Sequence, residues 1–347
     1  MMKIYLFLLG FFVALVSFGC SVKNVNSIIE LPKVSLADEE EEIFLQKKIL
    51  INEMIASSKV LHQISWPILN KNKDICFHNG PYSFGVLYAS KEDLPKKDSK
   101  YFKKILNKNI KLKYFEKYKI ESLPIIVSVA KNSPAYQSNL IEGDAVLKIN
   151  NLSVIDFRVK LKKALATSSK LKLTILRNEK ILEKEIIGVR ACNYNVQAIP
   201  SPAPNAYADG EKIFITLAAI KLARTKDELA FLIGHELAHN IYHYKYNKGS
   251  EANSLAINYL DAPKLKNFNS FFIYSTQSKE IEADLKGVEI AFKGGYSLDN
   301  VNDYWRRLSV FNPNMISSSS SVYKSNALRA IMISKTLKKL KYSNEKK

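Results

Sequence analysis

The segment that most constrains the fold is IGHELAHNIYHYK, residues 233–245, which contains three of the chain's five histidines. His235 and His239 are four residues apart, so on a helix they share one face with Cβ atoms about 5–6 Å apart, and both imidazoles can reach one ion. Glu236 is rotated to the side, near enough to hold a water molecule at that ion. Because a catalytic zinc site has three protein ligands, a second element must pack beside this helix and supply the third.

The second element is predicted in SKEIEADLKGVEIAFKGGY, residues 278–296, where the apolar spacing is helical and two glycines can end the helix. Glu280 and Asp284 lie four apart on one face, whereas Glu282 points away from that face. Glu280 is the expected third ligand, and Asp284 can hydrogen-bond a ligand histidine and so fix its tautomer. The alternative interpretation is a solvated acidic helix face without metal.

The local sequence also predicts where the histidine helix begins. KIFITLAAI, residues 212–220, has the pattern of a strand that follows the Asp209-Gly210 turn. Thr225 and Glu228 then form a capping box, in which the threonine accepts from early helix amides and the glutamate reaches back. The metal-binding histidines therefore fall in the third and fourth turns of a helix.

Several motifs together resemble one family. NAYADG, HELAH and EIEAD followed by GGY are similar to motifs of the HtpX-like and CAAX-prenyl-protease-like zinc metallopeptidases, peptidase family M48. The resemblance covers about residues 192–329 and implies the gluzincin arrangement, with one zinc ion per chain bound by His235, His239 and Glu280. It further implies that Glu236 is the general base of the reaction.

Near its C-terminal end the chain departs from the family pattern. The family usually has His-Pro several residues before an arginine, and alignment on Arg329 places Tyr323 and Lys324 at that position. A tyrosine hydroxyl can donate a hydrogen bond to an oxyanion, so Tyr323 is the candidate oxyanion donor, with a purely structural role as the alternative. By resemblance, Arg329 pairs with an acidic residue near the site, which is Asp284 in this chain.

His243 lies four residues beyond the second predicted ligand. Bacterial members of the family often have a histidine there, so the resemblance implies a supporting position next to the metal ligands. Because three protein ligands already suffice for a catalytic zinc, an ordinary surface or core histidine is the alternative interpretation.

A β-rich region precedes the predicted metal site. We expect strands at 82–89, 123–130, 144–151, 170–178 and 180–189 and a helix at 156–167. Within this region, VSVAKNSPAYQSNLIEGDAVLKINN resembles the PDZ domain, over about residues 80–190 with a lysine-rich insertion at 91–119. The resemblance implies that the loop Phe84-Gly85-Val86 binds a peptide carboxylate while the peptide adds a strand to the sheet.

The first residues predict export. After Lys3 comes the apolar run IYLFLLGFFVALVSFG, and the basic start, apolar segment and small residue form a signal peptide at residues 1–19. Cleavage before Cys20 with lipidation of that cysteine, and ordinary cleavage after a small-x-small motif, are the two alternatives. We favour the lipoprotein, because the apolar run reaches Cys20 without a polar spacer. The protein would then lie in the bacterial periplasm, anchored to the membrane by lipid, or be soluble there after ordinary cleavage.

Two short regions connect the signal peptide to the PDZ-like region. Residues 20–42 are polar and end in DEEEE, which predicts a solvated acidic tether. Residues 43–79 form an N-terminal helical segment, with helical apolar spacing up to about His62.

The two remaining cysteines, Cys76 and Cys192, flank the PDZ-like region. An exported protein can keep a disulfide, so a bridge between them is expected, with two buried free thiols as the alternative. A bridge that closes so long a loop would stabilise the fold by about 4–5 kcal/mol in the chain-entropy model, less any strain.

The formal net charge of +19 is most concentrated at 91–119, which contains eleven lysines with tyrosines and phenylalanines among them. Basic residues interleaved with aromatic ones can indicate nucleic-acid binding. An exported protein rarely meets nucleic acid, so we favour a solvated lysine-rich face and predict no nucleic-acid partner. Attraction to anionic lipid headgroups is a by-product that this charge would allow.

These features predict an α+β fold, with a small PDZ-like β-barrel domain at 80–190 followed by a mostly helical, zincin-like metallopeptidase domain at 191–347. The expected function is a zinc-dependent endopeptidase of exported or misfolded envelope proteins, whose substrate pairs along an edge strand near Ile213 to Leu217. The PDZ-like domain would recruit or orient substrates, or cover the site. The alternative is a peptide-binding or chaperone-like protein with a latent zinc site, which would keep its function when Glu236 is replaced.

Overall fold

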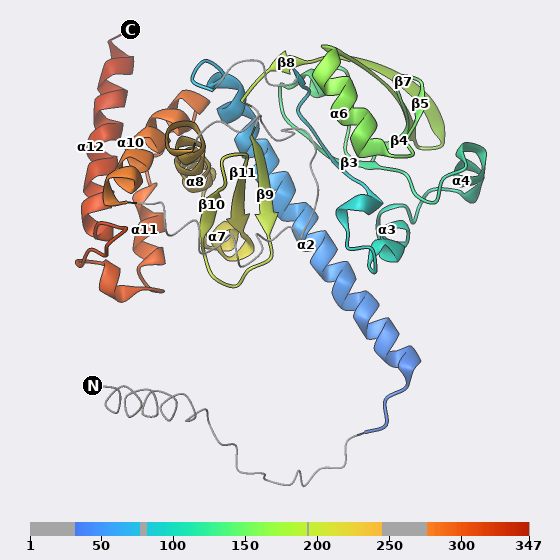
Figure 1. Ribbon diagram of the computed structural model, residues 1–347, viewed down its shortest axis with the longest axis horizontal. Helices are drawn as coiled ribbons and strands as arrows, with labels where there is room; N and C mark the ends of the chain where they lie inside the picture. The colour runs from blue at the N-terminus through green and yellow to red at the C-terminus, as the bar shows by residue number, and fades with distance from the viewer. Residues whose placement is uncertain (1–31, 77–81, 193, 245–275, 347) are drawn as a thin grey trace, which may run out of the picture. The chain divides into compact units, whose positions relative to one another are not determined.

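The computed structural model describes residues 32–76, 82–192, 194–244 and 276–346 (Figure 1). The chain divides into two compact units, residues 1–44 and 45–347. The signal peptide expected at 1–19 and the lipidation site Cys20 lie outside the described residues. Within the described residues, none of the helices combines the length and the apolar character that crossing a membrane requires.

Helix α2 (Leu36–Lys71) begins before the expected residue 43, continues past His62 and ends within the predicted helical segment 43–79. The acidic run DEEEE, expected in the tether, belongs to the first turns of this helix and is exposed. Ser35 precedes the helix, and its hydroxyl accepts a hydrogen bond from the backbone N–H of Asp38 at 3.1 Å. Carboxylates near a helix N-terminus interact favourably with the helix dipole, which explains why the helix includes the acidic run.

The region after α2 is an antiparallel sheet with the strand order β2-β3-β4-β6-β7, and β5 pairs with β4. The strands are Val86–Ala89 (β2), Ile125–Val129 (β3), Ala145–Ile149 (β4), Leu152–Ser153 (β5), Lys170–Arg177 (β6) and Lys180–Ile187 (β7). Each of the five strands predicted here is formed. The predicted helix is α6 (Phe157–Thr167), and the SPA segment begins the short helix α5 (Pro134–Gln137).

The prediction of a closed barrel is wrong for the described strands. The sheet path begins at β2 and ends at β7, and these two strands do not pair. The segments that flank the sheet, β1 (Tyr82–Ser83) and β8 (Val189–Arg190), pair with each other instead. Helix α6 covers the apolar side chains of β2, with the Phe157 ring 4.6 Å from the Tyr88 ring. An open sheet covered by a helix therefore buries the surface that barrel closure would have buried.

The lysine-rich insertion folds into a 3₁₀ turn η1 (Lys91–Asp93) and the helices α3 (Ser99–Leu106) and α4 (Leu112–Tyr118). Four of its five aromatic rings are core residues, and Tyr118 is partly exposed. Tyr101, Phe102, Tyr114 and Phe115 are between 1% and 7% exposed. Buried rings cannot stack on bases, which removes the aromatic part of the nucleic-acid pattern.

The second half of α2 contacts both the sheet and the C-terminal helices. The hydroxyl of Ser128 on β3 lies 3.1 Å from Nδ1 of His62 and accepts from Nε2 of Gln63 at 2.9 Å. The hydroxyl of Tyr296 donates to the backbone carbonyl of Ile64 at 3.0 Å. Helix α2 therefore connects the PDZ-like region to the helical region within the second unit.

A disulfide joins Cys76 to Cys192, whose Cα atoms are 5.5 Å apart and whose positions are separated by 116 residues. The backbone N–H of Cys192 also donates to the carbonyl of Leu69, in the last turn of α2, at 3.0 Å. The segment that follows the sheet is thus hydrogen-bonded to the last turn of α2 and joined by the disulfide to Cys76, shortly after that helix.

The C-terminal region is mostly helical and contains a small sheet with the order β10-β11-β9. Its elements are Asn195–Ile199 (β9), Ala206–Ala208 (β10), Lys212–Thr216 (β11), Leu217–Leu222 (α7), Lys226–Ala238 (α8), the π-helix His239–His243 (η2), Gln277–Gly294 (α10), Asn302–Leu308 (α11), the 3₁₀ turn Pro313–Met315 (η3) and Asn326–Glu345 (α12). Helix α10 packs between α8 and α12 (Figure 1).

The strand predicted at 212–220 is shorter than expected, because β11 ends at Thr216. The Thr216 hydroxyl accepts a hydrogen bond from the backbone N–H of Ala219 at 3.1 Å and so caps α7. A threonine N-cap can end a strand and begin a helix within one residue, and the apolar pattern of a buried strand does not reveal that change.

The buried His62 makes the stability of the fold dependent on pH. Burial lowers the pKa of His62 from its ordinary value of 6.5 to about 4. The unfolded chain therefore binds more protons than the folded chain as the pH falls below 6.5, and the free energy of unfolding decreases by about 2 kcal/mol between pH 7 and pH 5 from this group. Urea unfolding of the wild-type protein and of His62→Gln at both pH values measures the effect. We expect a smaller decrease in the variant, and equal decreases would contradict the assignment.

Candidate metal centre

Helices α8 and α10 cross at a pair of glycines. A Cβ atom added to Gly234 on α8 would lie 2.5 Å from the backbone carbonyl oxygen of Gly287 on α10. A Cβ atom on Gly287 would lie 2.8 Å from the backbone nitrogen of His235. Both distances are shorter than real Cβ contacts, so this approach of the two helix backbones requires glycine at both positions. The crossing lies next to the first histidine of HELAH and one turn from Asp284, so it sets how far apart the expected ligands are.

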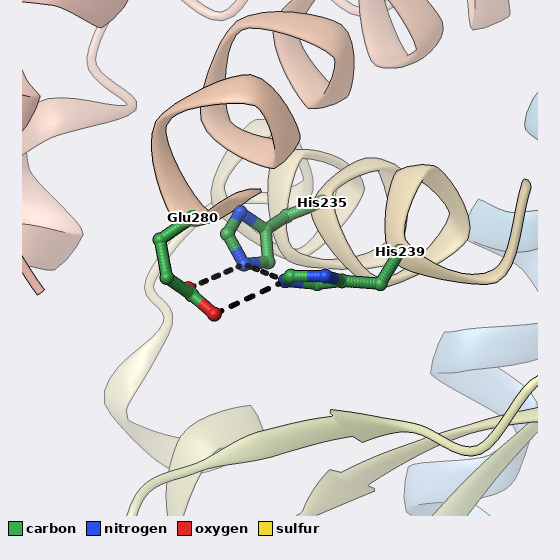
Figure 2. A group of neighbouring side chains, drawn as sticks. All are labelled: His235, His239 and Glu280. Carbon is green, nitrogen blue, oxygen red and sulfur yellow. Dashed lines mark hydrogen bonds and ion pairs between the residues drawn. The ribbon is translucent and has the colours of Figure 1, made fainter. Parts of the chain in front are cut away.

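Figure 2 shows His235, His239 and Glu280 pointing toward one another from α8, its continuation η2, and α10. The Nε2 atoms of the two histidines are 3.2 Å apart, and oxygens of Glu280 lie 3.5 Å from each of them. A tetrahedral zinc with bonds of about 2.0–2.1 Å needs ligand atoms about 3.3 Å apart. The two 3.5 Å contacts are made by different oxygens of Glu280, and one ligand atom from each of the three residues lies within 4.8 Å of the others. The group could therefore hold one ion, and two imidazole nitrogens with a carboxylate oxygen form a donor set that zinc favours.

Charged residues from two further helices support His235. Its Nδ1 atom lies 3.0 Å from Oδ1 of Asp284. Arg329 on α12 donates from Nε and Nη2 to the two oxygens of Asp284, at 2.7 and 2.8 Å. The Arg329 guanidinium lies 4.1 Å from the ring centre of Trp305 and 5.3 Å from that of Tyr323. The orientation of His235 thus depends on the ion pair between Asp284 and Arg329. The guanidinium of this pair lies close to two aromatic rings.

His243 supports the other histidine. In the π-helix η2, Nδ1 of His243 lies 2.8 Å from Nδ1 of His239, and the ring centres are 4.9 Å apart. On its other side, Nε2 of His243 lies 3.1 Å from Oε2 of Glu282. Glu282 points away from the ligand face of α10, as predicted. Its carboxylate contacts His243, and the sequence pattern did not predict this contact. π-Helical turns are rare and are frequent at functional sites.

The charges and hydrogen bonds of the cluster favour the binding of a cation. Burial would raise the pKa of Glu280, yet hydrogen bonds with His235 and His239 lower it well below its usual range. Burial would lower the pKa of His235, yet its contacts with Asp284 and Glu280 raise it to about 10. Without a metal, a proton on His235 therefore balances the carboxylates, and a divalent cation would replace that proton on binding.

Glu236 has the protonation behaviour of a general base. Burial raises the pKa of Glu236 to about 7, with the adjacent His235 opposing the rise and Glu280 adding to it. A carboxylate with a pKa near neutrality can both accept and return a proton at physiological pH. Glu236 is not among the three grouped ligand atoms, which leaves its carboxylate available to a reacting group.

The ligand atoms face a cavity of about 420 Å³ that is also lined by Glu236, Tyr323 and the edge strand β10. The prediction that the segment near 213–217 is an edge strand is wrong, because β11 lies between β9 and β10 and hydrogen-bonds to both. The neighbouring strand β10 is at the edge of the sheet instead. The NAYADG motif, which was used only as a family signature, therefore supplies the strand beside the site.

Two residues near the site were missed by sequence reasoning. Tyr207 on β10 lines the cavity, and its hydroxyl accepts from Nδ2 of Asn205 at 2.8 Å. Trp305 on α11 lines the cavity and stacks on Arg329. The position of Tyr207 within NAYADG was a usable signal, whereas no spacing in the sequence relates Trp305 to the histidine helix.

The predicted peptide-binding loop lies at the start of β2. Phe84 is buried, and the carbonyl of Gly85 accepts from the backbone N–H of Ala130 at 2.9 Å. Phe84 and Val86 line a small cavity of about 30 Å³ together with side chains of α6 and the sheet. None of the three loop residues lines the cavity at the metal centre.

The fold and the site together combine HExxH on one helix with a glutamate from a second helix, in a mostly helical region whose ligand atoms could hold one metal ion. Residues 178–335 match the family model of peptidase family M48, somewhat less than half of the chain. The match supports a protease of this metallopeptidase family, whose members bind zinc. No curated protein matches the chain closely enough to count as a relative.

Replacing Gly287 by alanine tests the role of the helix crossing. The new Cβ would meet the backbone of His235 at 2.8 Å, so α8 and α10 must separate and the ligand atoms with them. Because a tetrahedral site tolerates deviations of only about 0.2 Å, we expect zinc affinity to fall by at least about tenfold in Gly287→Ala. Competition with a chromophoric chelator measures the affinity.

Gly294→Ala on the same helix is the control for this experiment. Its Cβ would meet Cγ1 of the Ile68 side chain at 2.9 Å, away from the ligands. This variant should lose folding stability in urea but keep the zinc affinity of the wild-type protein. If Gly287→Ala also keeps that affinity, the crossing does not set the ligand geometry.

Proposed function

We propose that the protein is a zinc-dependent endopeptidase. The observation that carries this proposal is the grouping of His235, His239 and Glu280, whose ligand atoms lie within 4.8 Å of one another at the wall of an open cavity. The match of residues 178–335 to peptidase family M48 supports the same activity independently of the geometry.

Zinc bound to these three residues would polarise the scissile carbonyl and lower the pKa of a water molecule toward neutrality. Glu236 lies beside the ligands and takes the proton of the attacking water, then returns it to the leaving amine. Burial of the carboxyl group raises its pKa above the ordinary carboxylate range, which favours its role as a proton acceptor that holds the proton before returning it.

Tyr323 is the proposed donor to the developing oxyanion. It lines the cavity, and burial together with the negative charge of Glu280 and Glu236 raises its pKa, against the opposing charge of Arg329. The hydroxyl therefore keeps its proton at neutral pH and can donate it in a hydrogen bond. Its ring, close to Arg329, would also keep the hydroxyl in a fixed position.

The proposed substrate is an extended polypeptide that pairs with the edge strand β10. An extended peptide can add as a strand to the edge of a sheet, and β10 is at the edge of its sheet and lines the cavity that contains the ligands. This arrangement would hold the scissile bond of a peptide in a defined register beside Glu236.

We further propose that the protein acts in the bacterial periplasm on exported or misfolded envelope proteins. The apolar run before Cys20 supports export and a lipid anchor, and the disulfide between Cys76 and Cys192 suits an oxidising compartment. The PDZ-like region would recruit substrates or regulate access, with Phe84-Gly85-Val86 as its peptide-binding loop. No nucleic-acid partner is proposed.

The competing proposal is a peptide-binding or chaperone-like protein with a latent zinc site. It is motivated by Tyr323 and Lys324, which stand where the family usually has His-Pro. Such a protein would bind zinc and unfolded polypeptides without cleaving them.

Metal content and cleavage of casein, measured on the same preparations, distinguish the two proposals. We expect about one zinc per chain in the wild-type protein and in Glu236→Gln. Chelator-sensitive cleavage should occur in the wild-type protein and fall by at least about 100-fold in Glu236→Gln, because a general base contributes about that much or more. Glu289→Gln is the matched control, since that carboxylate pairs with Lys286 on α10 and does not line the cavity.

Zinc without cleavage in the wild-type protein would favour the latent binder. A wild-type protein that binds no zinc would rule out both proposals. Equal loss of cleavage in Glu289→Gln and Glu236→Gln would show that the effect is structural rather than catalytic.

A further inference from the structure

Residues 91–119, inserted between β2 and β3, divide their charges between the interior and the surface. Ten of their eleven lysines, all except Lys91, are exposed, whereas Asp93 and Asp98 are 1% and 4% exposed. Glu92 and Glu116 are the exposed acidic residues of the insertion. The insertion therefore presents ten positive and two negative side chains to solvent.

Cations from other elements neutralise the two buried carboxylates. Asp93 is paired with Arg158 on α6, and Asp98 accepts a hydrogen bond from Nζ of Lys47 on α2 at 2.8 Å. Because these partners lie outside the insertion, the two carboxylates do not offset the positive charge that the insertion presents to solvent. Of the exposed lysines, Lys111 contacts Glu179 at 2.7 Å, and an ion pair as exposed as this one is weak.

The two helices of the insertion form a packed support for these lysines. Phe102 on α3 and Phe115 on α4 are buried. Asn107, between the helices, donates from Nδ2 to the backbone carbonyl of Leu123 at 3.0 Å and accepts from the backbone N–H of Leu123 at 2.8 Å. The aromatic side chains of both helices thus pack inward, and the lysines between them extend into solvent.

An apolar side chain stands among the lysines. Leu112, the first residue of α4, is 66% exposed, and its neighbours Lys111 and Lys113 are exposed as well. One exposed leucine is ordinary on a protein surface, but a leucine between two exposed lysines matches the two layers of a membrane interface. The ammonium groups can lie at anionic headgroups while the leucine reaches the boundary of the acyl chains.

We propose that the exposed lysines of residues 96–119, together with Leu112, dock on an anionic lipid bilayer. We call this set of residues the lysine surface. Each lysine close to an anionic bilayer strengthens binding by about fivefold, so a few of them suffice. The docking would hold the folded part of the protein at a membrane whether or not Cys20 carries a lipid.

Nucleic acid is the other polyanion that a basic surface can bind, and the structure favours the bilayer over it. The insertion contains no arginine, the residue that most often reads guanine through two parallel hydrogen bonds. Four of its five aromatic rings are buried and cannot stack on bases. Lysine ammonium groups are compact point charges that need no fixed geometry, which suits a layer of mobile headgroups.

The test is sedimentation with lipid vesicles, using the chain from residue 21 onward. This form keeps every described residue and lacks the apolar run and Cys20, so neither contributes to binding. Vesicles of equal parts phosphatidylglycerol and phosphatidylcholine are compared with vesicles of phosphatidylcholine alone. We expect at least about tenfold tighter binding to the anionic vesicles at about 0.1 M salt, and a preference below about threefold at about 1 M salt, where charges are screened within about 3 Å.

Two triple variants with the same change in net charge locate the surface. The first variant replaces three exposed lysines of the insertion, by Lys108→Gln, Lys113→Gln and Lys117→Gln. The control variant replaces three exposed lysines of α12, by Lys335→Gln, Lys338→Gln and Lys339→Gln. We expect the affinity for anionic vesicles to fall by at least about tenfold in the first variant and by less than about threefold in the control.

A second pair of variants tests the apolar contact. Leu112→Ser should weaken binding to the anionic vesicles by about threefold or more, because a leucine gains free energy when it leaves water. Leu152→Ser, on β5 and 56% exposed, should leave binding unchanged. Equal affinities of the Leu112→Ser and wild-type proteins would show that the leucine does not enter the bilayer, which contradicts the proposal.

Two further outcomes would overturn the lysine surface. One is equal affinity of the wild-type protein for the two kinds of vesicle, and the other is an equal loss in the two triple variants, which would assign the binding to net charge alone. Duplex DNA is titrated under the same conditions, and a loss of affinity for DNA but not for vesicles in the insertion variant would identify nucleic acid as the partner instead. These outcomes are separate from zinc content and cleavage, since none of residues 91–119 lines the cavity at the metal centre.

Discussion

The close contact between α8 and α10 is the constraint on which the site depends. Each helix has a glycine where the two backbones meet, Gly234 and Gly287, and neither position has room for a Cβ atom. This contact places His235 beside the middle of α10. Glu280 on the same helix then lies close to the imidazoles of His235 and His239. Other contacts adjust ring orientation, but the distance between the two helices decides whether three ligand atoms can share one ion.

The grouping of side chains at the candidate metal centre could be predicted in large part from the sequence, because it follows from the helical period. A spacing of four residues puts two side chains on one helix face whatever the tertiary structure, and this applies to His235 with His239 and to Glu280 with Asp284. The pairing of the two helices was inferred from chemistry, since zinc needs a third ligand and residues 278–296 offer an acidic helix face with suitable spacing. The secondary structure of the PDZ-like region followed in the same way from alternation and turn residues.

Features that depend on tertiary distances could not be predicted. Strand order is one example, since nothing in the residues of β11 shows that β10 lies on its outer side. The open sheet is another, because whether a helix or another strand covers β2 is decided by packing rather than by the pattern of β2. The contact of Glu282 with His243 depends on a π-helical turn, and neither residue has a sequence signal for it.

The disulfide between Cys76 and Cys192 decides whether the chain would stay in one piece if the protein cleaved its own backbone. Every residue between the two cysteines, including the whole PDZ-like region, lies inside one covalent ring. A single backbone cut anywhere in that ring leaves both fragments joined through sulfur, and α2 stays attached to the region that carries the histidines. The molecule can therefore be nicked there and still migrate as one chain until a reductant is added.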